Sequence, residues 1–240
     1  MNLLAIDTAT EKFSLAISEG SNTWFFQADA GLRHSELLME GIDLLMKKAA
    51  LKPADLEGIV CSGGPGSFTG LRIGFSTAKG LALPLDIPFV SVPTLDCIAR
   101  PFASLPQLIV PVIDAKQNAF FCAMYHNGIK IHPDMDAKAA EIALTLNEAL
   151  LQQGLSDIQG RVLLTGPGAQ LLCEKLSLEK DFNFNCIING KELIWGNALS
   201  LLTIAKEKKY FSGEQTEIPS GPQYIRKSDA EIKGGGEVRS

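Results

Sequence analysis

Two stretches of the chain carry residues whose types and spacing could hold a phosphate group. The first is Asp7-Thr8, which directly follows an apolar run. A carboxylate and a hydroxyl group at the end of a buried strand are well placed for this, because α/β proteins bind ligands beyond the carboxyl ends of their strands. The second is residues 61–74, where five glycines and one proline leave backbone N–H groups open to an anion. The candidate nucleotide or anion ligands are Asp7, Thr8, Gly64, Gly66 and Ser67.

The glycine-rich stretch departs from the standard nucleotide-binding motifs. A Walker A motif has Lys after its last glycine, whereas Gly70 is followed by Leu71. A Rossmann motif that starts at Gly64 needs another glycine at position 69, where this chain has Thr69. The stretch therefore predicts a sharp strand-to-helix turn, with anion binding kept as an alternative.

The second half of the chain contains a counterpart of Asp7. Asp114 also follows an apolar run. Kinases and ATPases of the actin-like class carry a glycine or other small residues after these aspartates, but here Ala9 and Lys116 stand in those places. An autonomous actin-like ATPase or small-molecule kinase is therefore only the alternative function. The competing interpretation is that both aspartates accept hydrogen bonds from backbone N–H groups in turns.

The sequence predicts no metal site, no catalytic residue and no cofactor held by this chain alone. Its three histidines are not spaced to ligate an ion from one helix face, and no Ser-His-Asp or Cys-His set is recognisable. Its five cysteines are odd in number, widely spaced and without a C-x-x-C motif. We therefore expect reduced, mostly buried thiols in a cytoplasmic protein.

Composition narrows the classes of function further. Of 240 residues, 46% are hydrophobic and 20% charged, and no apolar run approaches the ~20 residues that span a bilayer. The N-terminus lacks basic residues and soon meets Asp7, which predicts a buried strand and no signal peptide. A net charge of −5 without a long basic run argues against nucleic-acid binding by this chain alone.

Apolar periodicity predicts the elements that must position these residues. In the first half we expect strands at 3–6, 13–18, 23–27, 58–61 and 89–92, and helices at 35–50, 69–83 and 94–103. In the second half we expect strands at 108–113, 119–125, 129–132, 162–165 and 184–188, and helices at 141–153, 169–176 and 194–209.

The second half thus repeats the first half in the order of its elements. Internal duplication of this kind predicts an α/β, actin-like (ASKHA) fold of two βββαβαβα lobes. We expect an N-terminal lobe at 1–104 with partner-binding helices, and a C-terminal lobe at 105–226 whose last helix can pack across the lobes. The polar, glycine-rich tail 227–240 is predicted to be disordered.

The first two predicted helices carry more apolar or small surface than one buried stripe needs. The apolar band of helix 35–50 is wider than the ~100° that packing on a sheet requires. In helix 69–83, residues Gly70, Gly74, Ala78 and Ala82 are spaced four apart and form a smooth strip. Both patterns predict contact with another helix or another chain, although plain burial in a core explains the wide band equally well.

Taken together, these stretches resemble the motifs of the bacterial TsaB (YeaZ) family. The similar segments are residues 4–10, 33–36, 64–74, 78–82, 112–115 and 222–226. The resemblance implies a role in making N6-threonylcarbamoyladenosine at position 37 of tRNAs that read codons starting with A. It implies a non-catalytic subunit that activates a TsaD-type catalytic subunit, acts with a TsaE-type ATPase and meets tRNA only through their complex.

The resemblance also implies where a partner binds. The family builds its dimer or heterodimer surface from the first two helices. The resemblance therefore leaves two points open: whether the chain alone is a homodimer or a monomer, and whether ATP or ADP binds at the subunit junction. The chain departs from the family at Gly63, Lys116 and Asn118, where Arg, Arg and an acidic residue are usual. The implied interface residues are His34, Glu36, Leu37, Gly41, Leu44, Leu45, Phe68, Leu71, Arg72, Gly74, Phe75 and Ala78.

Overall fold

A computed structural model describes residues 1–29, 34–155, 162–179, 182, 185–189, 196–211 and 221–222, with the side chains of residues 34 and 35 excepted. The tail 227–240, predicted to be disordered, lies outside these residues. So do Arg33 and residues 223–226 of the segments that resemble the family.

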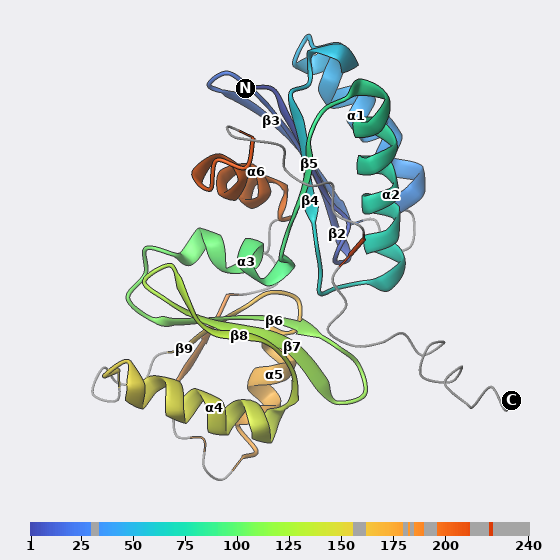
Figure 1. The fold of residues 1–240 in the computed structure, drawn as a ribbon. Coiled ribbons are helices and arrows are strands. Elements are labelled where there is room, and N and C mark those ends of the chain that lie inside the picture. Colours follow the sequence, from blue (N-terminus) through green and yellow to red (C-terminus); the bar gives the residue numbers. More distant parts are fainter. Residues whose placement is uncertain are drawn as a thin grey trace, which may run out of the picture.

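The first lobe is a five-stranded mixed sheet in the order β3-β2-β1-β4-β5 (Figure 1). Its strands are β1 (Leu3–Asp7), β2 (Lys12–Glu19), β3 (Asn22–Asp29), β4 (Gly58–Ser62) and β5 (Phe89–Val92). Helices α1 (His34–Lys48) and α2 (Phe68–Leu85) lie side by side on one face, with a short 3-10 turn η1 (Pro53–Asp55) between α1 and β4. Every residue of β1 is buried, because helices cover both faces of the sheet at this strand.

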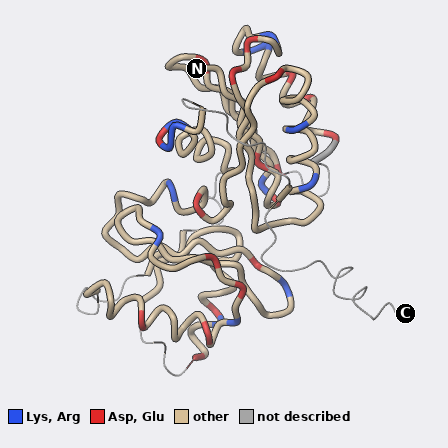
Figure 2. Tube along the Cα trace, viewed as in Figure 1, with Lys and Arg blue, Asp and Glu red and all other residues tan. Residues whose placement is uncertain are grey.

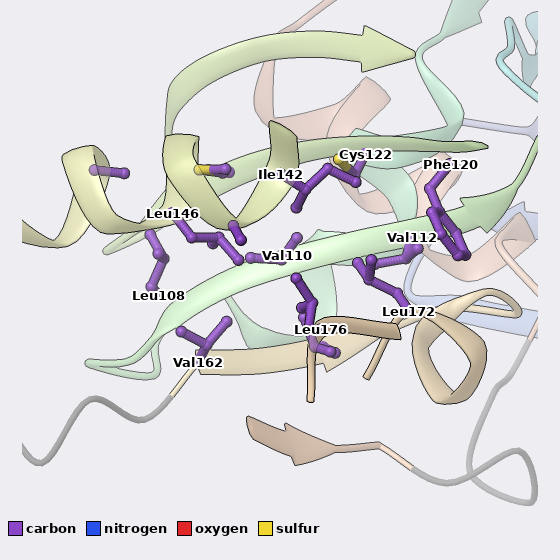
Figure 3. Packing of buried hydrophobic residues seen from close by; sticks show 14 of the residues in the cluster. Leu108, Val110, Val112, Phe120, Cys122, Ile142, Leu146, Val162, Leu172 and Leu176 are labelled. Carbon is purple, nitrogen blue, oxygen red and sulfur yellow. The ribbon is translucent and has the colours of Figure 1, made fainter. Parts of the chain in front are cut away.

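The second lobe repeats this arrangement in the order β8-β7-β6-β9-β10. Its strands are β6 (Leu108–Asp114), β7 (Ala119–His126), β8 (Ile129–Lys138), β9 (Val162–Thr165) and β10 (Cys186–Ile188). Helices α4 (Ala139–Gln152) and α5 (Ala169–Leu176) cover one face and close a core that includes Leu108, Val110 and Leu146 (Figure 3). The predicted α/β, actin-like fold of two duplicated lobes is confirmed.

Two helices lie between the sheets and join the lobes (Figure 1). Helix α6 (Ala198–Glu207) packs on β1, β2 and β4 of the first sheet. Helix α3 (Thr94–Ala99) places Cys97 in the same cluster as α6 and places Leu95 and Ile98 in a cluster with the second sheet. Asp96, on the same helix, accepts hydrogen bonds from the Tyr125 hydroxyl at 2.6 Å and from the Lys130 ammonium at 2.7 Å.

Several predicted boundaries differ from the structure. The predicted helix 94–103 ends at Ala99 and continues as a 3-10 turn η2 (Arg100–Phe102), because proline at position 101 lacks the N–H of an α-helical hydrogen bond. Helix α2 extends through Pro84 to Leu85, and strand β8 continues to Lys138, well beyond the predicted end at 132. Among the described residues, no helix is long and apolar enough to cross a membrane.

Candidate functional site

The first candidate site lies at the carboxyl end of β1, where Asp7 has no exposed surface. Oδ1 of Asp7 accepts hydrogen bonds from the Ser62 hydroxyl at 2.6 Å and the Ala9 backbone N–H at 3.2 Å. Oδ2 accepts from the backbone N–H of Asn197 at 2.9 Å and from its amide Nδ2 at 3.0 Å. A carboxylate has about four acceptor positions, so the chain's own donors fill those of Asp7.

The electrostatic setting of Asp7 is a balance of two effects. Burial raises the pKa of its carboxyl above the ordinary value, because the charged form loses its hydration. Hydrogen bonds from Ser62, Asn197 and Ala9 lower that pKa, and burial has the larger effect. The group therefore serves as an internal acceptor that joins the end of β1 to β4 and to the start of α6.

The glycine-rich stretch packs against the chain's own residues at the end of β1. A methyl group on Gly70 would overlap the carbonyl oxygen of Thr8, and one on Gly66 would overlap that of Ala9. The Thr8 hydroxyl donates a 2.7 Å hydrogen bond to the Gly70 carbonyl, and the Ser67 N–H donates one of 2.7 Å to the Ala9 carbonyl. These glycines are therefore needed for close contact between the turn and β1.

The remaining candidate ligands also have partners within the chain. Gly64 donates its N–H to the Thr94 hydroxyl at 3.2 Å and accepts the Thr94 N–H at 2.7 Å. The Ser67 hydroxyl caps α2 by accepting the N–H of Gly70 at 3.2 Å. The structure thus brings the five candidate ligands together around the end of β1, and nucleotide binding by them stays a prediction.

Three further polar residues of this site were missed from the sequence: Ser62, Thr94 and Asn197. Ser62 ends a buried strand parallel to β1, so its position beside Asp7 could have been inferred from strand pairing. Asn197 was placed inside a predicted helix at 194–209, whereas α6 begins after it and leaves its N–H free for Asp7. Nothing in the local sequence indicates that partnership.

The counterpart site in the second lobe is more open. Asp114 accepts the backbone N–H of Lys116 and the Lys116 ammonium, each at 2.8 Å. Burial raises the pKa of Asp114, but these bonds and the charge of Lys116 outweigh burial and lower it overall. Lys116, Gln117 and Asn118 all have left-handed backbone angles, with φ of 62°, 54° and 61°. Lys116 thus folds back onto Asp114 in a tight turn.

The predicted partner surface divides into buried and exposed residues. On α1, Leu45 is 4% exposed and packs in the core of the first lobe, while its neighbour Leu44 is 44% exposed. Gly41 is covered by Leu15 and Phe26 of the sheet, which explains the mid-helix glycine without any partner. The wide apolar band is therefore mostly core.

The small-residue strip of α2 lies on the side of the helix that packs against its own lobe. Gly70 and Gly74 lie against Thr8 at the end of β1, and Ala78 is fully buried in the core. The reason is that β1 and the turn approach closely enough to exclude side chains. Six of the implied interface residues are therefore buried in the lobe itself, and their part in a partner interface stays a prediction: Gly41, Leu45, Leu71, Gly74, Phe75 and Ala78.

The exposed side of α1 and α2 has a composition of its own, and we call it the outer surface. On α2 the Arg72 guanidinium stacks on the Phe68 ring, 3.8 Å from its centre. Glu36 is exposed and Leu37 half-buried, while the side chain of His34 lies outside the described residues. The outer surface includes the uncharged residues Met39, Leu44, Thr69, Ser76, Gly80 and Leu83 and the charged residues Glu36, Glu40, Asp43, Lys47, Lys48, Arg72 and Lys79.

The described residues contain no group of His, Cys, Asp and Glu side chains that could hold a metal ion. His126 contacts Gln153, and His132 contacts the carbonyl of Pro133. Cys61, Cys97 and Cys122 are buried, as expected, whereas Cys173 and Cys186 are partly exposed.

Comparison with known proteins gives a consistent result. Residues 28–234 match the family described as "TsaD: tRNA N6-adenosine threonylcarbamoyltransferase". The chain is 31% identical over 188 residues to the tRNA threonylcarbamoyladenosine biosynthesis protein TsaB of Bacillus subtilis, covering 71% of this chain and 82% of that relative. Against TsaB of Escherichia coli K12 the identity is 28% over 176 residues, covering 71% and 73%. The solved structure of YeaZ from Pseudomonas aeruginosa shares the fold, with a TM-score of 0.73, 21% identity and coverage of 93% and 99%.

Proposed function

Since the chain belongs to the TsaB (YeaZ) family, we propose that it acts in the synthesis of N6-threonylcarbamoyladenosine in tRNA as a non-catalytic subunit. In this proposal it binds and activates a TsaD-type catalytic subunit, and a TsaE-type ATPase works with the pair. Membership of the family supports a role in this pathway. The hydrogen bonds that Asp7 accepts at the end of β1 support a role without catalysis by this chain.

The observation that carries the non-catalytic role is the set of internal partners of Asp7. An actin-like ATPase would need the carboxylate at this position to face phosphate, magnesium or water. Here the carboxylate is fully buried and accepts four hydrogen bonds from Ser62, Ala9 and Asn197. Binding a nucleotide there would require breaking these bonds and leaving their donors unsatisfied, which costs about 1–3 kcal/mol for each group.

The outer surface supports α1 and α2 as the place of partner binding. Met39, Leu44 and Leu83 expose 52%, 44% and 54% of their surface, respectively. On α2, Ser76 and Gly80 are small and exposed, and a Cβ on Gly80 would meet no atom within 4 Å. Exposed apolar side chains allow a partner to bury apolar area, and small exposed residues on a helix allow another helix to approach closely.

Charge supports contact with tRNA through the complex and not through this chain alone. The net charge is −5. Acidic and basic segments are interspersed over the described part of both lobes, without a continuous basic band (Figure 2). Phosphate contacts would therefore come mainly from the catalytic partner. ATP or ADP, where it takes part, would lie at the junction with that partner.

The test is a reconstituted modification reaction with purified catalytic subunit, ATPase subunit, tRNA and threonylcarbamoyl-adenylate. We expect modified adenosine only when this chain is present, and no ATP turnover by this chain alone. ATP hydrolysis by the isolated chain at about 1 s⁻¹ or faster would favour the alternative, an autonomous actin-like ATPase or kinase.

A further inference from the structure

One short segment of the chain, residues 94–102, makes polar contacts with both lobes. It consists of α3 and the 3-10 turn η2, and α3 lies between the two sheets (Figure 1). At its first residue, Thr94 donates its N–H to the Gly64 carbonyl at 2.7 Å, and the Thr94 hydroxyl accepts the Gly64 N–H at 3.2 Å. The start of the segment is thus held against the glycine-rich turn of the first lobe.

Asp96 joins the same segment to the second lobe. Its Oδ1 accepts a hydrogen bond from the Tyr125 hydroxyl of β7 at 2.6 Å and one from the Lys130 ammonium of β8 at 2.7 Å. The Lys130 ammonium also donates to Asp134 of β8 at 2.7 Å. The side chains of Asp96, Lys130 and Asp134 are 19%, 29% and 21% exposed. Water therefore screens these contacts less than it screens an ion pair on an open surface.

The surroundings of this cluster keep its two donors protonated. Burial, the charge of Asp96 and the hydrogen bond to Asp96 raise the pKa of the Tyr125 hydroxyl. Burial by itself would lower the pKa of Lys130, but the hydrogen bonds to Asp134 and Asp96 outweigh burial and raise it overall. Both groups therefore remain donors to Asp96 at neutral pH.

Arg100 joins the end of the segment to α6, the helix that packs on the first sheet. Its Nε donates to Oε2 of Glu207 at 3.0 Å, and its Nη2 donates to Oε1 of the same carboxylate. Paired contacts of this kind are stronger and more directional than a single ionic hydrogen bond. Cys97 lies in an apolar cluster with α6, whereas Leu95 and Ile98 pack with the second sheet. The segment therefore contacts the first lobe on one side and the second lobe on the other.

We propose that residues 94–102, held by the contacts of Thr94, Asp96 and Arg100, form a clamp that keeps the two lobes in one fixed relative position. Two-lobed proteins commonly open and close around a cleft by rotation about a hinge. Here such a rotation would separate α3 from α6 or from the second sheet, and it would break the contacts of Arg100 or those of Asp96. The hydrogen bonds between Gly64 and Thr94 also restrain the connection from β5 to α3, which a hinge would have to bend.

The experiment measures the distance between the lobes in the full chain by pulsed electron paramagnetic resonance. Spin labels are attached at Lys79→Cys on α2 and Glu148→Cys on α4, both of which are exposed positions. The partly exposed Cys173 and Cys186 are first replaced by serine, and the buried cysteines stay unlabelled. Dilution with unlabelled chain restricts the signal to distances within one chain. We expect one narrow distance when the clamp is intact.

The combined variant Asp96→Ala and Arg100→Met removes contacts on both sides of the clamp. We expect the distribution of distances to become about twofold wider or more, because motion between the lobes is released. The matched control combines Asp134→Ala with Lys12→Met, which removes one ion pair inside each lobe and leaves the clamp in place. This control should keep the width of the intact chain.

The proposal fails if the chain with an intact clamp gives a broad or two-peaked distribution, or if the combined variant is no wider than its control. Circular dichroism checks that each variant is folded. If the combined variant does not fold, Arg100→Met alone decides against Lys12→Met, since these two side chains are similarly exposed, 33% and 31%. A wider distribution with Arg100→Met supports the clamp, and equal widths overturn it.

Discussion

The Asp7 carboxylate and Asn197, 190 residues apart in the sequence, are joined by two hydrogen bonds of 2.9 and 3.0 Å inside the protein. One end of this contact is the last residue of the central strand β1, and the other is the residue before α6. The contact therefore fixes the last described helix to the first sheet. It also occupies the carboxylate that an actin-like ATPase would direct toward its ligand.

A first prediction concerns this internal role of Asp7. Asp7→Ala removes the acceptor for Ser62, Ala9 and Asn197 and leaves their donors buried without partners. We expect the free energy of unfolding to fall by about 3 kcal/mol, since each unsatisfied group costs about 1–3 kcal/mol and some relaxation is available. Urea unfolding of the isolated chain measures this loss of free energy.

Asp114→Ala is the matched control for that variant. Asp114 occupies the equivalent position in the second lobe, and among the described residues its carboxylate accepts hydrogen bonds only from Lys116, which is largely exposed. We expect a loss of no more than about 1 kcal/mol. Equal losses of stability in the two variants would show that Asp7 contributes no more to the folded state than Asp114 does.

The pH dependence of stability gives a second prediction. Burial raises the pKa of Asp7 above its ordinary value of 3.8, so the folded state binds this proton more tightly than the unfolded chain does. The contribution of Asp7 to the free energy of unfolding is then fully present below about pH 4 and is lost as the pH rises through the raised pKa.

The variant Asp7→Asn has no titratable group at this position, so comparison with it isolates the contribution of the Asp7 carboxyl to the pH dependence. We expect the difference in free energy of unfolding, wild type minus Asp7→Asn, to decrease as the pH rises above about 4. A difference that increases with pH would mean that the hydrogen bonds from Ser62, Asn197 and Ala9 outweigh burial and depress this pKa.

Much of the fold could be predicted from the sequence because its signals are local. Alternating and continuous apolar runs mark the strands, and the repeated order of elements reveals the two lobes. The side of a helix that meets its sheet is harder to infer. Leu44 and Leu45 are adjacent and equally apolar, yet one is 44% and the other 4% exposed. Which of them is buried depends on where α1 rests on β2 and β3, and that is tertiary information.

The site shows the same limit. Asp7 and the glycines of residues 61–74 stand out by residue type, and the structure brings Gly66, Gly70 and Gly74 against the end of β1. It could not identify Asn197 as the partner of Asp7, because only the packing of α6 on β1 brings them together. Nor could it distinguish glycines that approach a ligand from glycines that approach Thr8 and Ala9.

A third prediction uses two glycines of α2 as a matched pair. Gly70→Ala would force a methyl group into the Thr8 carbonyl, whereas Gly80→Ala places one in open space. We expect Gly80→Ala to raise the free energy of unfolding by about 0.5–1 kcal/mol, the usual helix preference for Ala over Gly. Gly70→Ala should lower it by about 2 kcal/mol or more. Stabilisation of the isolated chain by both variants would contradict the close approach of α2 to β1.

A fourth prediction addresses the outer surface. Leu44→Asp places a charge on an exposed position of α1, so the isolated chain should lose no more than about 1 kcal/mol of stability. Association with the TsaD-type subunit should weaken at least tenfold, about 1.4 kcal/mol, because a buried apolar contact is replaced by an unpaired charge. Titration calorimetry of the two purified subunits measures the change.

The control for Leu44→Asp is Leu144→Asp on α4, the helix that takes the place of α1 in the second lobe. Leu144 is 57% exposed, and the substitution is chemically the same. We expect this variant to bind the catalytic subunit as the wild type does. Loss of binding with Leu144→Asp but not with Leu44→Asp would move the interface to the second lobe.

The most direct test of the proposed role is the amount of N6-threonylcarbamoyladenosine formed on tRNA in the reconstituted reaction, with the chain omitted, present as wild type, or present as Leu44→Asp. We expect modification with the wild type, none above background without the chain, and a strong reduction with Leu44→Asp at concentrations near the dissociation constant of the wild-type pair. Full modification by the catalytic and ATPase subunits without this chain would contradict it.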